Sequence, residues 1–550
     1  MANGYTVSDL VAEFLDKCGA ETAFGIVSVH NIPMLDAVSR SNRTHFVPTR
    51  GELGAAHMAD GYARASGTLG VLISSTGPGA ANTVGGLVEA RTASAPILHI
   101  TGQNPAALAD RGMGLVHDIP DQPGLMAASG KAAYRIRAGS EAFAVMKRAV
   151  EDALTFQKGP VTVEIPIDVQ LEEITRPSGL DVYALPKVEP VHPTGQEMDH
   201  LVDLVLEARR PMLWLGRGAA AAGNAARVLL DQGFGMVTSW AGHGVVSDDH
   251  PRNLGALNGL GVRVIEDFYQ TVDLMIVAGS RLRGHETGNF STPLPRKLVQ
   301  IDIDPAADGR TYPNTGFIRG DAALVLAALA ERIQDRIRIE DAFPEEVARL
   351  KSEARAAFRA TLGPYGSFAE ELRAAMPEDA IWARDVTLNN STWGHKLMPL
   401  HDHSTNIYPM GAGIGQGLCM GIGAAMAPGG RKTVAMTGDG GFYMHLAELW
   451  TAVQENLDLT ILVMNDGGYG VIRHIQDKAA DGRRGFDVIE GPDLEIVADA
   501  ARVPFWRVRS AAEFGETVRQ AIATTGVALV EVDILSVGDF PPYFPYGPKA

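Results

Sequence analysis

Two hydrophobic runs in the last quarter of the chain, each ending in an acidic turn, give the clearest structural signal in the sequence. The first run, 433–436, stops at the Gly-Asp-Gly turn 438–440, and the second, 459–464, stops at the Asn-Asp-Gly-Gly turn 465–468. Between them, apolar residues recur at helical spacing over 442–456. The pattern predicts strand, helix and strand, with both turns at one edge of a parallel sheet, where open α/β sheets bind ligands.

The same alternation of short apolar runs and helical segments extends over most of the chain. Thr6 begins a predicted amphipathic helix near the N-terminus. Strands are predicted at 23–27, 46–48 and 70–74, and further along at 211–215, 236–238, 274–278 and 298–303. A proline-rich linker at 175–195 and a charged helix at 340–360 separate the segments. We predict three doubly wound α/β domains with parallel sheets, at residues 1–178, 190–338 and 363–550.

Composition restricts the classes of protein that the chain can belong to. With 550 residues, 46% of them hydrophobic, it is long enough for several globular domains. A formal net charge of −17 argues against partners such as nucleic acid or anionic membranes. We find no apolar stretch of about 20 residues and no signal peptide pattern at the start. With only two cysteines, a disulfide framework is not expected, and we predict a reduced, cytoplasmic setting.

The residue types in the two acidic turns indicate a metal and phosphate site. Asp439 lies between glycines, so its backbone can approach a phosphate closely, and Asn465 and Asp466 offer further oxygen atoms. Oxygen ligands on adjacent strand ends suit Mg²⁺, which proteins usually hold with one or two carboxylates and substrate phosphates. The alternative is an ordinary βαβ unit with acidic turn residues.

The spacing between the two turns adds a resemblance to a known family. Asp439 and Asp466 are 27 residues apart, and the segment is similar to the metal-binding signature of thiamine diphosphate (ThDP) enzymes, although Asp466 stands where Asn is usual. The resemblance implies that Asp439, Asp466 and the carbonyl of Gly468 hold Mg²⁺. It also implies that further residues contact ThDP: Gly413, Ile414, Gly438, Gly440, Gly441, Tyr469 and Gly470.

Glu52 is the candidate catalytic residue of the N-terminal domain. Taken alone, it reads as a carboxylate that stabilises a helix N-terminus. Its context, RGELGAAHMADGYARASG, resembles the segment that carries the activating glutamate of ThDP enzymes, and the STGPGAAN segment after it matches the same domain. The resemblance implies that Glu52 binds the aminopyrimidine ring of ThDP and promotes its activation. It also implies that Ile414 props the cofactor into a bent shape that brings its reacting groups together.

Over nearly its whole length the chain is most similar to acetolactate synthase-like enzymes. The resemblance implies a carboligase that decarboxylates a 2-oxo acid such as pyruvate and joins the product to a second carbonyl compound. The candidate substrate residues are His30, His117, Asp118, Gln122 and Ile475.

Two departures from the family weaken the prediction of a carboligase. Ile475 stands where the family carries a Trp that selects the acceptor, and Gly284-His285 replaces an Asp-Arg pair. The missing guanidinium would otherwise clamp the acceptor carboxylate. Arg281, Arg283 or Arg473 are the candidate replacements.

Several alternatives follow from these departures. The chain could be a simple 2-oxo acid decarboxylase, a ThDP-dependent lyase or hydrolase of a ketone or diketone, or a relative that only binds. The resemblance allows FAD in the middle domain, and it implies a homodimer at minimum and commonly a homotetramer. The aromatic, proline-rich tail 539–550 is predicted either to close over the site or to pack on a neighbouring subunit.

Overall fold

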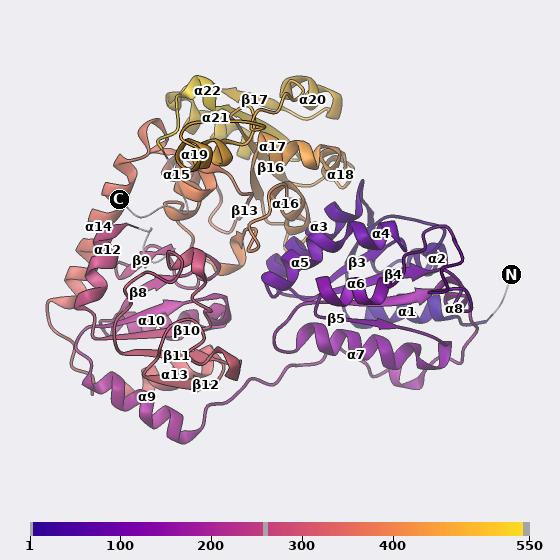
Figure 1. Ribbon diagram of the computed structural model, residues 1–550, viewed down its shortest axis with the longest axis horizontal. Coiled ribbons are helices and arrows are strands. Elements are labelled where there is room, and N and C mark those ends of the chain that lie inside the picture. The colour runs from indigo at the N-terminus through magenta and orange to yellow at the C-terminus, as the bar shows by residue number, and fades with distance from the viewer. Residues whose placement is uncertain (1–3, 257–261, 543–550) are drawn as a thin grey trace.

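Three parallel β-sheets follow one another along the chain (Figure 1). The computed structural model describes residues 4–256 and 262–542. Each sheet has six strands, and neighbouring strands pair in parallel throughout. Helices flank all three sheets, so the predicted fold class of three doubly wound α/β units is confirmed. The exact domain boundaries stay predictions.

The N-terminal sheet has the strand order β2-β1-β3-β4-β6-β5. Its strands are β1 (Thr22–Gly25), β2 (His45–Pro48), β3 (Gly70–Ser74), β4 (Ile97–Gln103), β5 (Ala132–Arg135) and β6 (Pro160–Pro166). The helices are α1 (Val7–Lys17), α2 (Ile32–Ser41), α3 (Glu52–Ser66), α4 (Pro78–Asn82), α5 (Val84–Thr92), α6 (Gln122–Ser129), α7 (Ala142–Leu154) and α8 (Ile167–Gln170). The helix start predicted at Thr6 is confirmed, because its side chain accepts from the Asp9 amide in a capping box.

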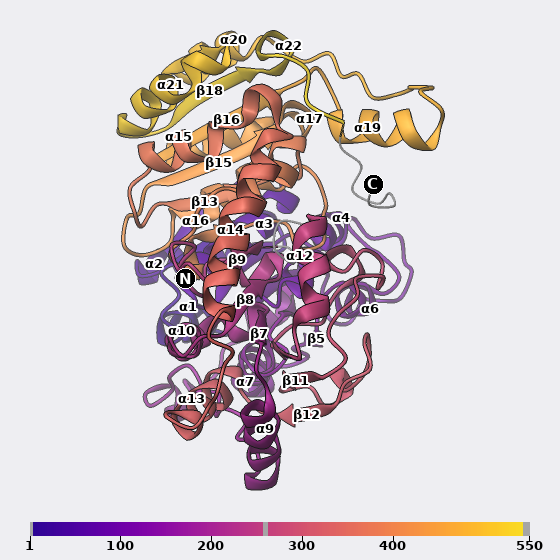
Figure 2. The ribbon, with the colours of Figure 1, turned by 90° about the vertical axis from the view of Figure 1, so that its left-hand side faces the viewer.

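The middle sheet has the order β12-β11-β10-β7-β8-β9. Its strands are β7 (Pro211–Leu215), β8 (Gly235–Thr238), β9 (Asn253–Gly255), β10 (Leu274–Ala278), β11 (Leu298–Asp302) and β12 (Gly316–Arg319). The helices are α9 (Gly195–Glu207), α10 (Gly223–Asp231), α12 (Arg263–Phe268) and α13 (Ala322–Ile333). The predicted charged connector is α14 (Phe343–Ala360), which runs from this domain to the C-terminal one (Figure 2).

The C-terminal sheet has the order β14-β13-β15-β16-β18-β17. Its strands are β13 (Ile381–Arg384), β14 (Asn406–Ile407), β15 (Thr433–Gly438), β16 (Leu459–Asn465), β17 (Phe505–Val508) and β18 (Ala528–Asp533). The helices are α15 (Phe368–Ala375), α16 (Gly417–Ala425), α17 (Asp439–Met444), α18 (Leu449–Gln454), α19 (Gly470–Ala479), α20 (Leu494–Ala501), α21 (Ala511–Ala523) and α22 (Ile534–Val537).

The single helix predicted over 442–456 is wrong in one respect. The chain forms α17 and α18 with a short 3₁₀ turn, Leu446–Glu448, between them. The reason is a long-range contact: the Glu448 carboxylate turns inward and accepts from the Arg50 amide of the N-terminal domain at 3.0 Å. Apolar spacing alone could not reveal this contact, because its partners are 398 residues apart.

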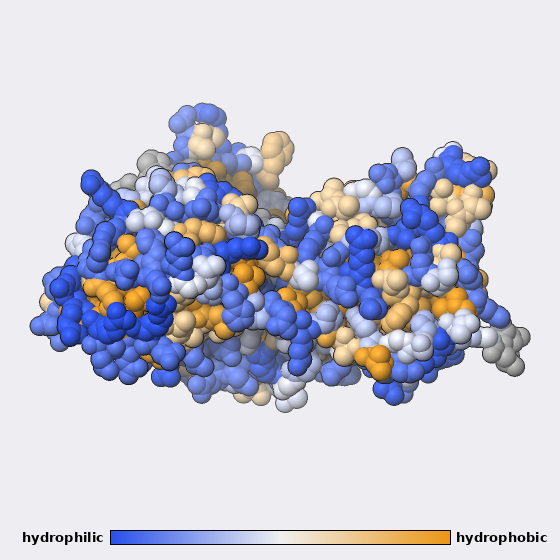
Figure 3. All heavy atoms as spheres, turned by 90° about the horizontal axis from the view of Figure 1, so that it is seen from below, coloured by the Kyte–Doolittle hydropathy of each residue, from blue (hydrophilic) through white to orange (hydrophobic). Residues whose placement is uncertain are grey.

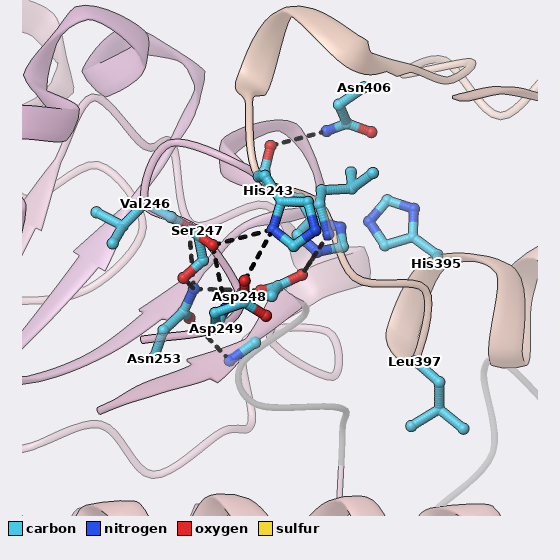
Figure 4. A network of polar contacts seen from close by, with 12 residues as sticks. His243, Val246, Ser247, Asp248, Asp249, Asn253, His395, Leu397 and Asn406 are labelled. Carbon is cyan, nitrogen blue, oxygen red and sulfur yellow. Dashed lines mark hydrogen bonds and ion pairs between the residues drawn. The ribbon is translucent and has the colours of Figure 1, made fainter. Parts of the chain in front are cut away.

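Two seams join the C-terminal domain to the others. At the first, α3 packs on α16 so closely that a Cβ added at Gly423 would meet the Met58 carbonyl oxygen at 1.9 Å. At the second, the buried Asp248 carboxylate contacts the His243 ring at 2.5 Å and accepts from the Leu400 amide at 2.9 Å (Figure 4). Both seams are tight, so the three domains hold their candidate site loops in fixed places.

The surface and the tail bear on two predictions. On the face in Figure 3, hydrophobic and hydrophilic residues are intermixed, and no helix of the described residues is long and apolar enough to cross a membrane. Residues 543–550 of the tail lie outside the described part of the chain. Phe540, just before them, stacks on Tyr365 with ring centroids 4.6 Å apart. The role of the tail therefore stays a prediction.

Candidate active site

The two acidic turns meet at the edge of the C-terminal sheet, as predicted. β15 and β16 are neighbours, with Gly438 opposite Met464, so Asp439 and Asp466 follow directly from adjacent strand ends. The Asp466 amide approaches a carboxylate oxygen of Asp439 at 3.5 Å. β13 and β15 flank the point where the strand order reverses, which is the usual ligand crevice of such sheets.

The Asp439 carboxylate is buried and the Asp466 carboxylate is half-buried, with little positive charge around them. Asp439 is 1% exposed, and one oxygen of each carboxylate (Oδ2 of Asp439, Oδ1 of Asp466) has no hydrogen-bond partner among the described residues. Burial raises the pKa of both groups, and burial together with the charge of Asp439 raises the pKa of Asp466 to about 7. Arg473 offsets part of this charge through an ion pair with Asp466 at 3.4 Å. A divalent cation would satisfy both orphaned oxygens.

Glycines give the loop after β16 the shape that a metal site needs. Gly468 has φ of +148°, and a Cβ there would meet the Asp487 carbonyl oxygen at 2.0 Å. A Cβ at Gly470 would meet Asp466 Oδ2 at 1.9 Å. Any larger residue would push the loop away from the carboxylates. Two carboxylates, together with the Gly468 carbonyl that the family resemblance implies, are a donor set that fits Mg²⁺.

The loop before α16 carries the predicted cofactor residues Gly413 and Ile414 and lies beside the acidic turns. The Gly415 amide donates to both carboxylate oxygens of Asp385, at 3.1 and 2.9 Å. Asp385 also accepts from the Thr437 hydroxyl at the end of β15, and burial raises its pKa to about 6. Sequence reasoning missed Asp385, although an acidic residue directly after a buried strand is the same signal that identified Asp439.

Glu52 is the first residue of α3 and lies among turns at the carboxyl edge of the N-terminal sheet. Asn82 donates to its Oε2 at 3.2 Å. A Cβ at Gly79 would lie 2.9 Å from its Oε1, so the small residue leaves room for the carboxylate. Glu52 thus lies beside the STGPGAAN turn. It belongs to a different domain from Asp439 and Asp466.

The predicted substrate residues fall into two groups. His30 and His117 face each other with ring centroids 5.1 Å apart, and their Nδ1 atoms and Asp118 Oδ1 are buried without a hydrogen-bond partner among described residues. Burial lowers the pKa of His30. This group can bind or protonate a ligand. Ile475 lies on α19, which begins directly after the metal loop.

Gln122 differs from the other predicted substrate residues. It is fully buried, and its side-chain oxygen accepts from Thr76 at 2.9 Å and from the Gly77 amide at 2.6 Å. Its side-chain nitrogen donates to Glu164 at 2.7 Å. Both polar ends are therefore used to support the turn after β3. A substrate role for Gln122 stays a prediction.

The glycines of the middle domain do not form a phosphate cradle. The Gly218 amide donates to the Gly279 carbonyl at 3.0 Å, and a Cβ at Gly216 would meet the same oxygen at 2.2 Å. The loops after β7 and β10 are thus packed backbone to backbone. Trp240, 2% exposed, stacks on Tyr408 beside them. This packing does not fit the pyrophosphate of FAD.

Comparison with known proteins agrees with the three-domain layout. Residues 5–125, 198–329 and 389–532 match the N-terminal TPP binding domain, the central domain and the C-terminal TPP binding domain of thiamine pyrophosphate enzymes. The chain belongs to this family. TPP is another name for ThDP, so the family confirms the predicted cofactor class.

Curated relatives of this ThDP enzyme include decarboxylases and acetolactate synthases. A probable 2-ketoarginine decarboxylase of Pseudomonas aeruginosa is 30% identical over 538 residues, 96% of this chain and 94% of the relative. The acetolactate synthase isozyme 1 large subunit of Escherichia coli is 30% identical over 86% of this chain and 84% of the relative. A probable acetolactate synthase large subunit of Methanocaldococcus jannaschii is 28% identical over 96% and 91%. The predicted resemblance is confirmed at the level of this group.

The raised pKa of Asp466 predicts that metal binding depends on pH. Because the folded pKa of about 7 lies above the ordinary aspartate pKa of about 3.9, the metal-free site keeps a proton that Mg²⁺ must displace. Mg²⁺-dependent ThDP binding should therefore strengthen by up to about tenfold per pH unit from pH 5.5 to 7 and level off above. For the same reason the stability of the metal-free protein should fall as the pH rises through this range.

Fluorescence titrations with ThDP at fixed Mg²⁺ and several pH values measure this effect. Asp466→Asn is the matched control, because an amide keeps the oxygen ligand but has no proton to displace. Its binding should vary much less with pH. Equal pH dependence in both proteins would contradict the assignment of Asp466 as the titrating ligand.

Proposed function

We propose that this protein is a Mg²⁺- and ThDP-dependent enzyme that decarboxylates a 2-oxo acid. The observation that carries the proposal is the orphaned carboxylate pair Asp439 and Asp466 at adjacent strand ends, beside a glycine-rich loop and in a ThDP enzyme family chain. The relatives support it, since one of them is a probable decarboxylase of 2-ketoarginine, which is a 2-oxo acid.

The residues for the cofactor come from the C-terminal domain. Asp439, Asp466 and the Gly468 carbonyl would hold Mg²⁺ with the diphosphate, next to Gly438, Gly440 and Gly441 and to Tyr469 and Gly470. Gly413 and Ile414 would hold the organic part of the cofactor. ThDP, when bound, supplies a nucleophilic carbon and an electron sink next to the substrate carbonyl. The protein itself has to bind, orient and exclude water.

Glu52 would move the proton that activates the cofactor, and we propose that it does so for a second copy of the chain. In a single chain two neighbouring apolar side chains are exposed here: Ile414 on the loop before α16 (the cofactor loop, 408–415) is 40% exposed, and Met444 at the end of α17 is 49% exposed. A partner's N-terminal domain would cover them. We therefore propose a homodimer at minimum, with a homotetramer as the form common in the family.

His30 and His117 are the proposed proton donors and substrate contacts. Their unpartnered ring nitrogens lie at the edge of the same sheet as Glu52. The lowered pKa of His30 keeps it neutral near pH 7, so it can accept and return a proton.

The candidate arginines bear on whether the product is released or joined to a second carbonyl compound, because joining would need a clamp for the acceptor carboxylate. Arg281, Arg283 and Arg473 each donate to a main-chain carbonyl of this chain, at 2.8–3.1 Å, so all three candidate replacements are engaged within the protein. This favours a simple decarboxylase, which needs no clamp for a second carboxylate. Carboligation of the acetolactate synthase type, predicted first from the sequence, is the second candidate, supported by the names of two relatives.

The two cysteines are consistent with the proposed reduced setting. Cys18 and Cys419 are both free and buried. We retain the cytoplasm as the proposed location. FAD in the middle domain is not part of the proposal, because the geometry of that domain does not support it.

Changes at Glu52 and Asp439 should separate activation from binding. Glu52→Gln should leave Mg²⁺-dependent ThDP binding intact and lower turnover by about 10²–10⁴-fold, because only a proton transfer is lost. Asp439→Ala should abolish Mg²⁺-dependent ThDP binding itself. Calorimetric titration and initial rates on the purified variants measure both. Loss of cofactor binding in Glu52→Gln, or full activity in Asp439→Ala, would refute these roles.

Product analysis tests the reaction. The purified protein with ThDP and Mg²⁺ is given pyruvate and a panel of larger 2-oxo acids, including one with a terminal guanidinium group, and the products are identified by NMR. We expect CO₂ and the aldehyde one carbon shorter from at least one of them. Acetolactate from pyruvate would establish the carboligase instead. Turnover of diketones without CO₂ release would replace the proposal with C–C bond cleavage.

A further inference from the structure

Charged side chains from two other domains hold the start of the cofactor loop. This segment, 408–411, leads into Gly413 and Ile414. Glu89 on α5 reaches it from the N-terminal domain, together with Arg64 on α3. Arg283 reaches it from the middle domain and donates to the Met410 carbonyl at 2.8 Å. Glu89 and Arg64 lie outside the cofactor and substrate residues assigned above.

Glu89 makes the most specific of these contacts. Its Oε1 accepts from the Met410 amide at 2.5 Å and its Oε2 accepts from the Gly411 amide at 2.8 Å. The residue is 2% exposed, so both bonds are shielded from water. Two consecutive amides on one carboxylate fix the direction of the chain at this point, because both N–H groups must face the same side chain.

Arg64 supports Glu89 and binds the same loop. Its guanidinium donates to the Tyr408 carbonyl at 2.7 Å and to Asp60 at 2.6 Å, and it lies 3.8 Å from Glu89. Burial raises the pKa of Glu89 to about 6, and the positive charge of Arg64 opposes that rise. A buried carboxylate is costly to keep unless its hydrogen bonds are used, and here the amides of the cofactor loop use them.

The far end of the same loop is held in a similar way. Gly415 donates to both oxygens of the buried Asp385, as described above. Between the two carboxylates, Ala412 adopts φ of +61°, and Ile414 projects outward with 40% of its surface exposed. A short exposed tip is thus fixed at both ends by buried carboxylates from different domains.

We propose that Glu89 is a positioning residue that fixes the cofactor loop, so that Gly413 and Ile414 are placed for ThDP before the cofactor binds. The inference rests on the proposed function, since it assigns those two residues to ThDP. A preorganised loop spares the cofactor the entropy of ordering it. Glu89 therefore acts on cofactor affinity through the backbone of residues 410 and 411, without contact with the cofactor.

The test uses the full-length protein and two substitutions of graded effect. Glu89→Ala removes both acceptors. Glu89→Gln keeps the volume and one acceptor oxygen, but its NH₂ group cannot accept from the second amide. Glu151→Gln, the same chemical change at an exposed position on α7, is the matched control. Thermal unfolding of all proteins shows whether the fold is kept.

Two readouts separate positioning from general stability. Hydrogen exchange of the peptide that contains residues 408–416, measured without cofactor, reports loop order directly. Titration with ThDP at saturating Mg²⁺ gives the dissociation constant. We expect faster exchange confined to this peptide, and ThDP binding weaker by at least about tenfold in Glu89→Ala and by less in Glu89→Gln. Glu151→Gln should match the unmodified protein.

Unchanged loop exchange and unchanged ThDP affinity in both Glu89 variants would overturn the proposal. A lower unfolding temperature without either effect would do the same, because it would reduce Glu89 to a stabiliser of the domain seam. If Glu89→Ala does not fold, Glu89→Gln decides. Failure of the unmodified protein to bind ThDP would instead refute the proposed function, and the exchange data would still report on the loop.

Discussion

Two carboxyl groups that lie close together, with little positive charge beside them, determine the arrangement of the site. Asp439 and Asp466 leave adjacent strand ends, and each keeps an oxygen without a hydrogen-bond partner among described residues. Arg473 forms ion pairs with both Asp466 and Asp487, so only part of its positive charge offsets Asp466. Because unpaired buried charge is costly, the folded chain favours binding of a cation here. A Cβ at Gly468 would meet the Asp487 carbonyl oxygen and a Cβ at Gly470 would meet the Asp466 carboxylate, so both glycines let the second turn fold tightly around Asp466.

The rest of the chain brings the organic part of the cofactor site to this metal site. Asp385 ties the loop before α16 to the end of β15, and Glu89 ties the same loop to the N-terminal domain. The tight α3–α16 contact and the seam around Asp248 fix the domains relative to one another. Cofactor binding should therefore depend on contacts among all three domains, although the proposed metal ligands come from one. The exposed tip with Ile414 explains why a second copy is part of the proposal.

Local signals in the sequence predicted most of the fold and the meeting of the two acidic turns. Short apolar runs predicted the strands, and an acidic residue beside glycine after each of β15 and β16 marked the two turns. Long-range contacts account for what was missed. Glu448 breaks the helix predicted over 442–456 because it faces Arg50, and the contacts of Gln122 with the turn after β3 were missed because its partners are distant in sequence. Glu89 carries no motif, since its role exists only once the loop at 410–415 lies beside it. Asp385 follows the buried strand β13, but its contact with that loop could not be predicted from this position alone.

The central claim is that Asp439 and Asp466 hold a divalent cation together with the diphosphate of ThDP. Mn²⁺, which accepts the same oxygen ligands as Mg²⁺, makes this directly measurable by electron paramagnetic resonance. The account predicts that Mn²⁺ binds the purified protein tightly only when ThDP is present, with a single cation for each chain, and that Asp439→Ala abolishes this binding. Tight Mn²⁺ binding that does not need ThDP, or that survives Asp439→Ala, would contradict it.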